Sequence, residues 1–154
     1  MYYSRKTVDG SVYGILKAGT DGSNPTGIVK CSEGAYGIQI DYKAKRLYWA
    51  EYYVDRIRSS DLDGGDVVTI AETPAPYGIA LVDQRIYWGE YSSGLVYSIS
   101  VEGTGIRNET NAIARTRNFV YSNWNPPKNR SNDCEQQSCG FVCVLSRTSF
   151  KCLA

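Results

Sequence analysis

The 154-residue sequence predicts an all-β protein assembled from repeated four-stranded sheets, and three observations carry this prediction. The chain matches itself at separations of about 40 residues, a period typical of repeated β architectures. It contains 13 Tyr and 15 Gly, and enrichment in these residues favours short strands and tight turns. Within one repeat, four short runs of apolar or β-branched residues are separated by turn residues.

The clearest internal match joins residues 36–52 to residues 77–91. Both segments begin with Tyr-Gly-Ile and end with Tyr-Trp, a small residue, Glu and Tyr. Tyr36 and Tyr77 are 41 residues apart, and Trp49 and Trp88 are 39 apart. A partial third copy lies upstream, where Asp21-Gly22 matches Asp63-Gly64 at a spacing of 42. Repeats of this length that resolve into four strands are the blades of a β-propeller.

The predicted strands can be counted along the chain. The first blade lacks its innermost strand and has three others, at residues 2–4, 12–18 and 27–31. Two complete blades follow at residues 36–72 and 77–114, the first with strands at 37–41, 46–51, 55–62 and 67–72. Residues 118–122 then form one further innermost strand. The total of twelve strands equals three four-stranded blades per chain.

Two four-residue motifs occupy the same place in the complete repeats, Tyr48-Trp49-Ala50-Glu51 and Tyr87-Trp88-Gly89-Glu90. They resemble the Tyr-Trp-Thr-Asp (YWTD) motif of the class B repeats of low-density-lipoprotein receptors. Glu here replaces the motif Asp, and a small residue replaces Thr. The run from Ile57 to Gly65 resembles the third strand and turn of the same repeat. The resemblance implies a six-bladed propeller, of which this chain would form half, followed by an epidermal-growth-factor-like (EGF-like) module.

The last 21 residues contain four of the five cysteines. Their spacing resembles the first four cysteines of an EGF-like module, truncated before the fifth. The resemblance implies disulfides Cys134–Cys143 and Cys139–Cys152, whereas spacing permits three connectivities. The predicted domains are a three-blade propeller half at residues 1–124, a Pro/Asn linker at 125–133 and the truncated module at 134–154. We expect no calcium, other metal or cofactor.

Three blades are too few to close a ring, so their open faces and strand edges need a partner. The preferred hypothesis is a two-fold homodimer in which each subunit supplies the missing innermost strand of the other's first blade. The alternative is that the chain is a fragment of a longer receptor. The exchanged strand would consist of Asn118, Phe119, Val120, Tyr121 and Ser122.

Composition argues for a secreted, non-enzymatic protein. The sequence has no His, which excludes Ser-His-Asp catalysis and His-ligated zinc. The net charge of +1 provides no field for binding nucleic acid, and no apolar run is long enough to span a membrane. The cysteine framework and the N-glycosylation sequons at Asn108 and Asn129 favour a secreted chain.

Members of the resembled family bind protein or peptide ligands on the face where the inner strands begin. The function expected first is therefore recognition of a protein or peptide, followed by a lectin with repeated aromatic and carboxylate pockets, and then a structural or adhesive matrix component. Blade packing for the tryptophans and blade-to-blade hydrogen bonding for the carboxylates are the structural alternatives. The candidate ligand contacts are Tyr36, Tyr77, Trp49, Glu51, Tyr52, Trp88, Glu90 and Tyr91.

Cys31 is the odd cysteine, just beyond the last strand of the first blade. Three states are open for it: a buried free thiol, a disulfide to Cys31 of a second subunit, or a tether to another molecule.

Overall fold

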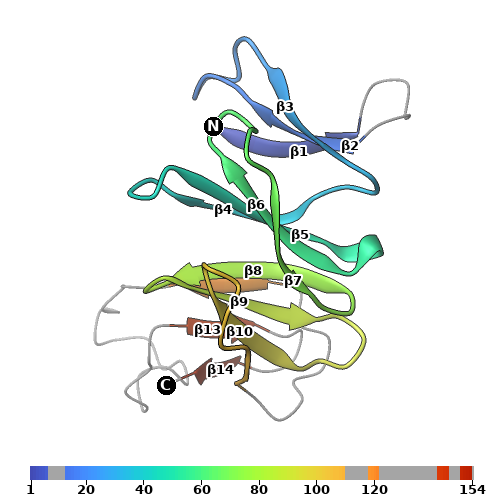
Figure 1. Ribbon diagram of the computed structural model, residues 1–154, viewed down its shortest axis with the longest axis vertical. Coiled ribbons are helices and arrows are strands. Elements are labelled where there is room, and N and C mark those ends of the chain that lie inside the picture. The colour runs from blue at the N-terminus through green and yellow to red at the C-terminus, as the bar shows by residue number, and fades with distance from the viewer. Residues whose placement is uncertain (7–12, 110–117, 122–141, 146–149, 154) are drawn as a thin grey trace.

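A computed structural model describes residues 1–6, 13–109, 118–121, 142–145 and 150–153 (Figure 1). Within this part of the chain every strand pairing is antiparallel. The strands form four sheets in chain order, of three, four, four and three strands. Figure 1 shows the first three sheets following one another along the long axis, as consecutive blades of a propeller do.

The first sheet contains three strands: β1 (Tyr2–Lys6), β2 (Tyr13–Lys17) and β3 (Thr26–Cys31). The second contains four: β4 (Tyr36–Asp41), β5 (Arg46–Glu51), β6 (Arg56–Asp61) and β7 (Val68–Glu72). The third also contains four: β8 (Pro76–Val82), β9 (Arg85–Glu90), β10 (Val96–Ser100) and β11 (Arg107–Asn108). A short 3-10 helix, η1 (Tyr52–Val54), connects β5 to β6. These boundaries lie within a few residues of the predicted ones.

The fourth sheet differs from the predicted arrangement. Strand β12 (Asn118–Tyr121) lies where an innermost strand was expected, but it pairs with β13 (Val142–Leu145), which pairs with β14 (Phe150–Leu153). The cysteine-rich tail therefore adds two strands to β12 in the same chain, so that β12 does not stand alone. The short continuous apolar run Val-Cys-Val-Leu of segment 142–145 suits a strand, whereas the sequence analysis had assigned this segment by its cysteines only.

The innermost strands lie side by side, with β4 beside β8 and β8 beside β12. Gly37 allows the first of these contacts, because it has a φ of +57° and a Cβ at this position would lie 2.8 Å from the backbone nitrogen of Ile79. A residue with a side chain would be strained by this φ and would push the two strands apart. The absence of a side chain at Gly37 therefore permits the two complete blades to lie close together near the propeller axis.

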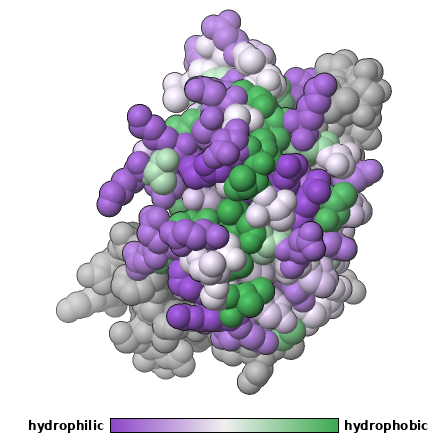
Figure 2. All heavy atoms as spheres, in the orientation of Figure 1, coloured by the Kyte–Doolittle hydropathy of each residue, from purple (hydrophilic) through white to green (hydrophobic). Residues whose placement is uncertain are grey.

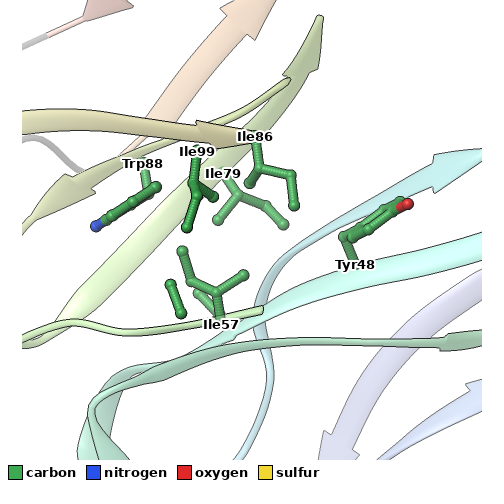
Figure 3. Close-up of a cluster of buried hydrophobic side chains, with 8 residues drawn as sticks. Tyr48, Ile57, Ile79, Ile86, Trp88 and Ile99 are labelled. Carbon is green, nitrogen blue, oxygen red and sulfur yellow. The ribbon is translucent and has the colours of Figure 1, made fainter. Parts of the chain in front are cut away.

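Strand β5 is buried on both sides, and its alternation explains how the blades pack. Leu47 and Trp49 belong to a cluster shared with the first sheet, which includes Ile15 and Val29. Tyr48 and Ala50 point the other way, into a cluster shared with the third sheet. Figure 3 shows this second cluster, in which Tyr48 and Ile57 face residues of the third sheet. The members from the third sheet are Ile79, Ile86, Trp88 and Ile99.

The turn after β6 connects consecutive blades through their backbones. Gly64 has a φ of +86°, and a Cβ there would lie 2.0 Å from the carbonyl oxygen of Ile28 in β3. The turn therefore packs directly on the outer strand of the preceding blade. Charged and polar residues cover most of the face drawn in Figure 2, where apolar residues form a narrow strip along the long axis.

Candidate functional site

Five tyrosine side chains meet at the edge of the sheets where β4 and β8 begin. They line a surface pocket of about 210 Å³, which we call the tyrosine pocket. Four of its members were predicted as ligand contacts, and the fifth, Tyr53, was not. The set is Tyr36, Tyr52, Tyr53, Tyr77 and Tyr91.

Tyr52 lies at the centre of this group. Its ring centroid is 5.8 Å from that of Tyr36, 4.8 Å from Tyr53, 5.8 Å from Tyr77 and 5.6 Å from Tyr91. These distances fall in the range of favourable aromatic pairs, and the rings of Tyr53, Tyr77 and Tyr91 stand nearly perpendicular to that of Tyr52. Each ring therefore restricts the orientation of its neighbours.

The repeat places these rings at equivalent points of two blades. Tyr36 begins β4 and Tyr77 lies near the start of β8, with ring centroids 5.0 Å apart. Tyr52 follows β5 and Tyr91 follows β9. The approach of β4 to β8 that Gly37 permits is what brings Tyr36 and Tyr77 into contact.

Asp55 connects the loop that carries Tyr52 to the next blade. It ends η1 in the left-handed conformation, with φ 55° and ψ 46°. Its backbone carbonyl accepts a hydrogen bond from the amide of Thr73 at 2.9 Å, and its carboxylate Oδ1 accepts one from the amide of Ala75 at 2.8 Å. The two loops that border the tyrosine pocket are therefore hydrogen-bonded to each other.

Glu51 is fully buried and belongs to the interior of the propeller. Its Oε1 accepts a hydrogen bond from the indole Nε1 of Trp49 at 3.2 Å, and its Oε2 accepts one from Nε of Arg56. Arg58 adds an ion pair, with Nη1 at 3.7 Å from Oε1. Two arginines and an indole thus compensate the charge of this carboxylate.

Glu90, at the equivalent place in the next blade, is 8% exposed and has neutral partners. Its Oε1 accepts a hydrogen bond from the hydroxyl of Thr73 at 3.1 Å, and its Oε2 accepts one from Ser93 at 2.8 Å. Thr73 follows β7 of the preceding blade, so its bond to Glu90 crosses the boundary between blades. The blade-to-blade role proposed for the carboxylates is present here.

The predicted ligand contacts therefore divide into two groups. The tyrosines gather in the pocket, whereas Trp49, Glu51, Trp88 and Glu90 are buried within or between the blades, which corrects their assignment as contact residues. Trp49 and Glu51 are two residues apart on one strand, so they share a face and point inward together. Tyr52 escapes this burial because β5 has ended and η1 has begun.

Cys31 is a free thiol, 3% exposed, in the buried cluster that also contains Trp49. Burial raises the pKa of this thiol to about 12, and the neighbouring Glu51 carboxylate adds to the effect. Within the single chain Cys31 is a buried thiol, and a disulfide to a second subunit or to another molecule stays a prediction.

The other predicted site residues fall partly outside the described residues. Asn108 lies exposed on β11, whereas Asn129, Cys134, Cys139 and Ser122 lie outside. The implied disulfide pairs each include one of these two undescribed cysteines, so the pairing stays a prediction. Within the sheet, the backbones of Cys143 and Cys152 lie opposite each other on β13 and β14.

The described residues contain neither a membrane-spanning helix nor a cluster of metal-binding side chains. Among them, no helix is long and apolar enough to cross a membrane. The same residues contain no group of three or more Cys, Asp or Glu side chains placed to hold a metal ion.

Curated relatives of the chain are receptors. It is 30% identical over 145 residues to low-density lipoprotein receptor-related protein 5 of Homo sapiens, which covers 90% of this chain and 9% of the relative. It is 27% identical over 137 residues to the vitellogenin receptor Yl of Drosophila melanogaster, covering 86% of this chain and 7% of that receptor. It therefore spans less than a tenth of the length of these relatives. No family model matches the chain.

Solved structures agree on the fold. The chain superposes with a TM-score of 0.67 on a chain from a crystal structure of a nidogen/laminin complex, at 19% identity, covering 91% of this chain and 54% of the other. A virginiamycin B lyase from Staphylococcus aureus gives a TM-score of 0.51 at 15% identity, covering 73% and 34%. Identities this low support the propeller fold and no shared activity.

The blades and the repeated Tyr-Trp motif define a class of protein, the β-propellers built from YWTD-type repeats. The chain is homologous to the class B repeat propeller region found in receptors of the low-density-lipoprotein-receptor family.

Proposed function

We propose that this chain is a non-enzymatic, extracellular recognition protein that binds a protein or peptide ligand through the tyrosine pocket. The observation that carries the proposal is the gathering of five tyrosine rings from two blades around one surface pocket. Tyrosine is enriched at the centres of protein interfaces, because it provides a large contact area at a low cost in side-chain entropy.

The size of the pocket supports a macromolecular ligand. Sites for small molecules usually enclose about 300–1,000 Å³, whereas the tyrosine pocket has about 210 Å³. A pocket of this size suits one side chain of a larger partner, with the surrounding loops providing the rest of the contact area.

The relatives support the same kind of ligand. One of them is named as a receptor for vitellogenin, a protein, and the structural neighbour comes from a complex of nidogen with laminin. The lectin alternative has less support, since the carboxylates of Glu51 and Glu90 are buried and cannot reach sugar hydroxyls from there.

Selection of peptides from a random phage-displayed library on the immobilised chain tests this proposal. We expect selected peptides to bind the wild-type chain and Tyr42→Leu equally, and to bind Tyr52→Leu at least tenfold more weakly. Tyr42 is a matched control because it is 75% exposed and lies outside the pocket. Circular dichroism would confirm that the variants fold. If no peptide is enriched, or if Tyr52→Leu binds equally well, the proposal is wrong. A glycan array with the same variants would identify a lectin instead.

We propose separately that a second blade-bearing unit, in the simplest case a second copy of the chain, covers the first blade. In the second and third blades, a Cβ on Gly64 or Gly103 would lie within 3.0 Å of a carbonyl oxygen of the preceding blade. A Cβ on the equivalent Gly22 would meet only Met1 Cε, at 3.8 Å. Among the described residues, therefore, no outer strand of another blade packs on the turn at Gly22 as Ile28 and Ile70 do on the turns at Gly64 and Gly103.

The strand exchange by residues 118–122 remains one way to build such a dimer, and it would require β12 to leave β13. Light scattering after size exclusion would measure the mass. We expect about twice 17.1 kDa, and a folded monomer at all concentrations would rule out the dimer without affecting the tyrosine pocket.

A further inference from the structure

The four loops that carry the tyrosine pocket have an uneven charge. They are residues 32–35 and 73–75, which precede β4 and β8, and residues 52–55 and 91–95, which follow β5 and β9. Glu33 and Asp55 lie in these loops, both exposed, and no Lys or Arg occurs in them. Glu72, also exposed, ends β7 beside one of the loops. The described loops around the pocket are therefore acidic.

The arginine that directly follows one of these loops is already engaged. Arg56 begins β6, and its Nε donates a hydrogen bond to the fully buried Glu51. Because the single charge of Glu51 is shared by Arg56 and Arg58, Arg56 offsets the three exposed carboxylates of Glu33, Asp55 and Glu72 only in part. Within the four described loops, a positive group that approaches the pocket meets the carboxylates of Glu33 and Asp55 and no Lys or Arg.

The tyrosine rings themselves also favour a positively charged ligand. The face of an aromatic ring is electronegative and attracts ammonium and guanidinium groups, and a cage of several rings is the usual receptor for alkylammonium ligands. Tyr52 has four ring neighbours with centroids at 4.8–5.8 Å, so several rings lie near any group that approaches it. An anion would be repelled by both the ring faces and the rim.

From this geometry we propose that the tyrosine pocket binds a cation carried on an alkyl chain, namely the side chain of a lysine or arginine of the partner. The proposal rests on the proposed function for the source of the cation, because a protein ligand supplies it. The pocket has a volume of about 210 Å³. That space accommodates the end of one long side chain.

The test uses probes that differ only in charge. The cationic probes are Nα-acetyl-lysine amide, Nα-acetyl-arginine amide and tetramethylammonium, and each is titrated into the chain. Nα-acetyl-norleucine amide and tert-butanol are the neutral counterparts. The aromatic resonances of the tyrosines, observed by NMR, report binding. We expect millimolar binding of the cations and at least tenfold weaker binding of the neutral probes. Equal affinity for charged and neutral probes, or no shift with any cation, would overturn the proposal.

Variants at the centre of the pocket distinguish ring from hydroxyl. We expect Tyr52→Leu to weaken cation binding about three- to fivefold, while Tyr52→Phe, which retains the ring face, stays within twofold of the wild type. Tyr42→Leu should bind as the wild type does. If Tyr52→Phe loses binding as Tyr52→Leu does, the ring face is not the receptor and the proposal fails.

The outcomes for this inference and for the proposed function can be separated with the selected peptides. If their affinity is lost with Tyr52→Leu but survives replacement of each Lys and Arg by norleucine, the cation proposal is wrong and the protein ligand stands. If cations bind while no peptide is ever enriched, the cation pocket stands and the proposed function is wrong.

Discussion

Trp88 donates a hydrogen bond from its indole Nε1 to the hydroxyl of Thr73, at 2.9 Å, across the boundary between two blades. The same hydroxyl donates a hydrogen bond to Oε1 of Glu90 at 3.1 Å, so it connects the indole to the carboxylate. In the preceding blade Trp49 occupies the equivalent place, yet its Nε1 bonds directly to Glu51. The repeat therefore conserves a buried indole and a buried carboxylate, and it connects them in two ways.

This relationship predicts the effect of Thr73→Val, which keeps the shape of the side chain and removes the hydroxyl. The indole N–H of Trp88 and one oxygen of Glu90 would lose their partner inside the protein. An unsatisfied buried polar group costs about 1–3 kcal/mol, so we expect the free energy of unfolding in urea to fall by about 2–3 kcal/mol.

Thr69→Val is the matched control for this variant. Thr69 lies exposed on β7, the strand that leads to Thr73, and its replacement should change the free energy of unfolding by less than about 0.5 kcal/mol. Equal effects of the two substitutions would mean that the hydroxyl of Thr73 contributes nothing beyond ordinary strand preference.

The second prediction concerns the reactivity of Cys31. The thiolate is the reactive form, and a pKa of about 12 keeps this buried thiol neutral at pH 8. We expect iodoacetamide to alkylate Cys31 at least 100-fold more slowly in the native chain than in the urea-unfolded chain, as measured by mass spectrometry of the peptide that contains it.

A neighbouring position provides the control, since Ser32 is exposed. In a Cys31→Ala, Ser32→Cys variant, the native chain should react nearly as fast as the unfolded one. Because the pKa of Cys31 is raised on folding, its neutral thiol contributes stability that is complete below the unfolded pKa of about 8.5 and is lost as the pH rises toward 12. Rapid native labelling at residue 31 would contradict the buried state.

The third prediction tests the contact between innermost strands. Gly37→Ala places a Cβ 2.8 Å from Ile79 N at a φ of +57°. The left-handed conformation alone costs a residue with a side chain about 1–2 kcal/mol. We therefore expect the free energy of unfolding, measured in urea, to fall by at least about 2 kcal/mol. The variant should also weaken cation binding, because Tyr36 and Tyr77 would separate.

Gly27→Ala provides the comparison, since a Cβ at Gly27 meets nothing within 4 Å. At such a site the loss of glycine lowers the entropy of the unfolded chain, so this variant should be neutral or more stable by up to about 1 kcal/mol. If Gly37→Ala is as stable as Gly27→Ala, the two blades have room to move apart.

Much of the fold follows from the sequence because the repeat and the alternation agree. The strand predicted at 46–51 has the bounds of β5, and the repeated tyrosines at 36, 52, 77 and 91 meet as neighbours. Self-comparison missed Tyr53, since the equivalent residue of the next repeat is Ser92. A pocket member present in only one blade leaves no periodic signal.

The sequence left two interpretations open for the Trp and Glu of each motif, ligand contact or packing between blades, and in the structure these side chains are buried. A repeat shows that Trp49 and Glu51 are equivalent to Trp88 and Glu90, but it does not show which way they point. Side-chain direction depends on the blade packed against each face, and both faces of β5 are covered. The pairing of β12 with β13 was missed for a related reason: strand partners so distant in sequence are chosen by tertiary packing.

The last prediction concerns acid stability at the turn after β6. The Asp61 carboxylate Oδ1 accepts hydrogen bonds from the amides of Asp63 at 2.9 Å and Gly65 at 2.8 Å, and these bonds hold the pKa of Asp61 below its usual value. A lowered pKa means that the carboxylate stabilises the fold above the unfolded pKa of about 3.9, and that this contribution is lost as the pH falls through the lower folded value.

We therefore expect the free energy of unfolding to fall less between pH 5 and pH 3 in Asp61→Asn than in the wild-type chain, while Asp61→Asn is the less stable of the two at pH 7. Urea titrations at each pH measure this difference. Asp83→Asn, which removes one exposed carboxylate from a turn in the next blade, controls for the change in net charge. If both variants alter the pH dependence equally, overall charge accounts for the acid response and the turn at Asp61 does not.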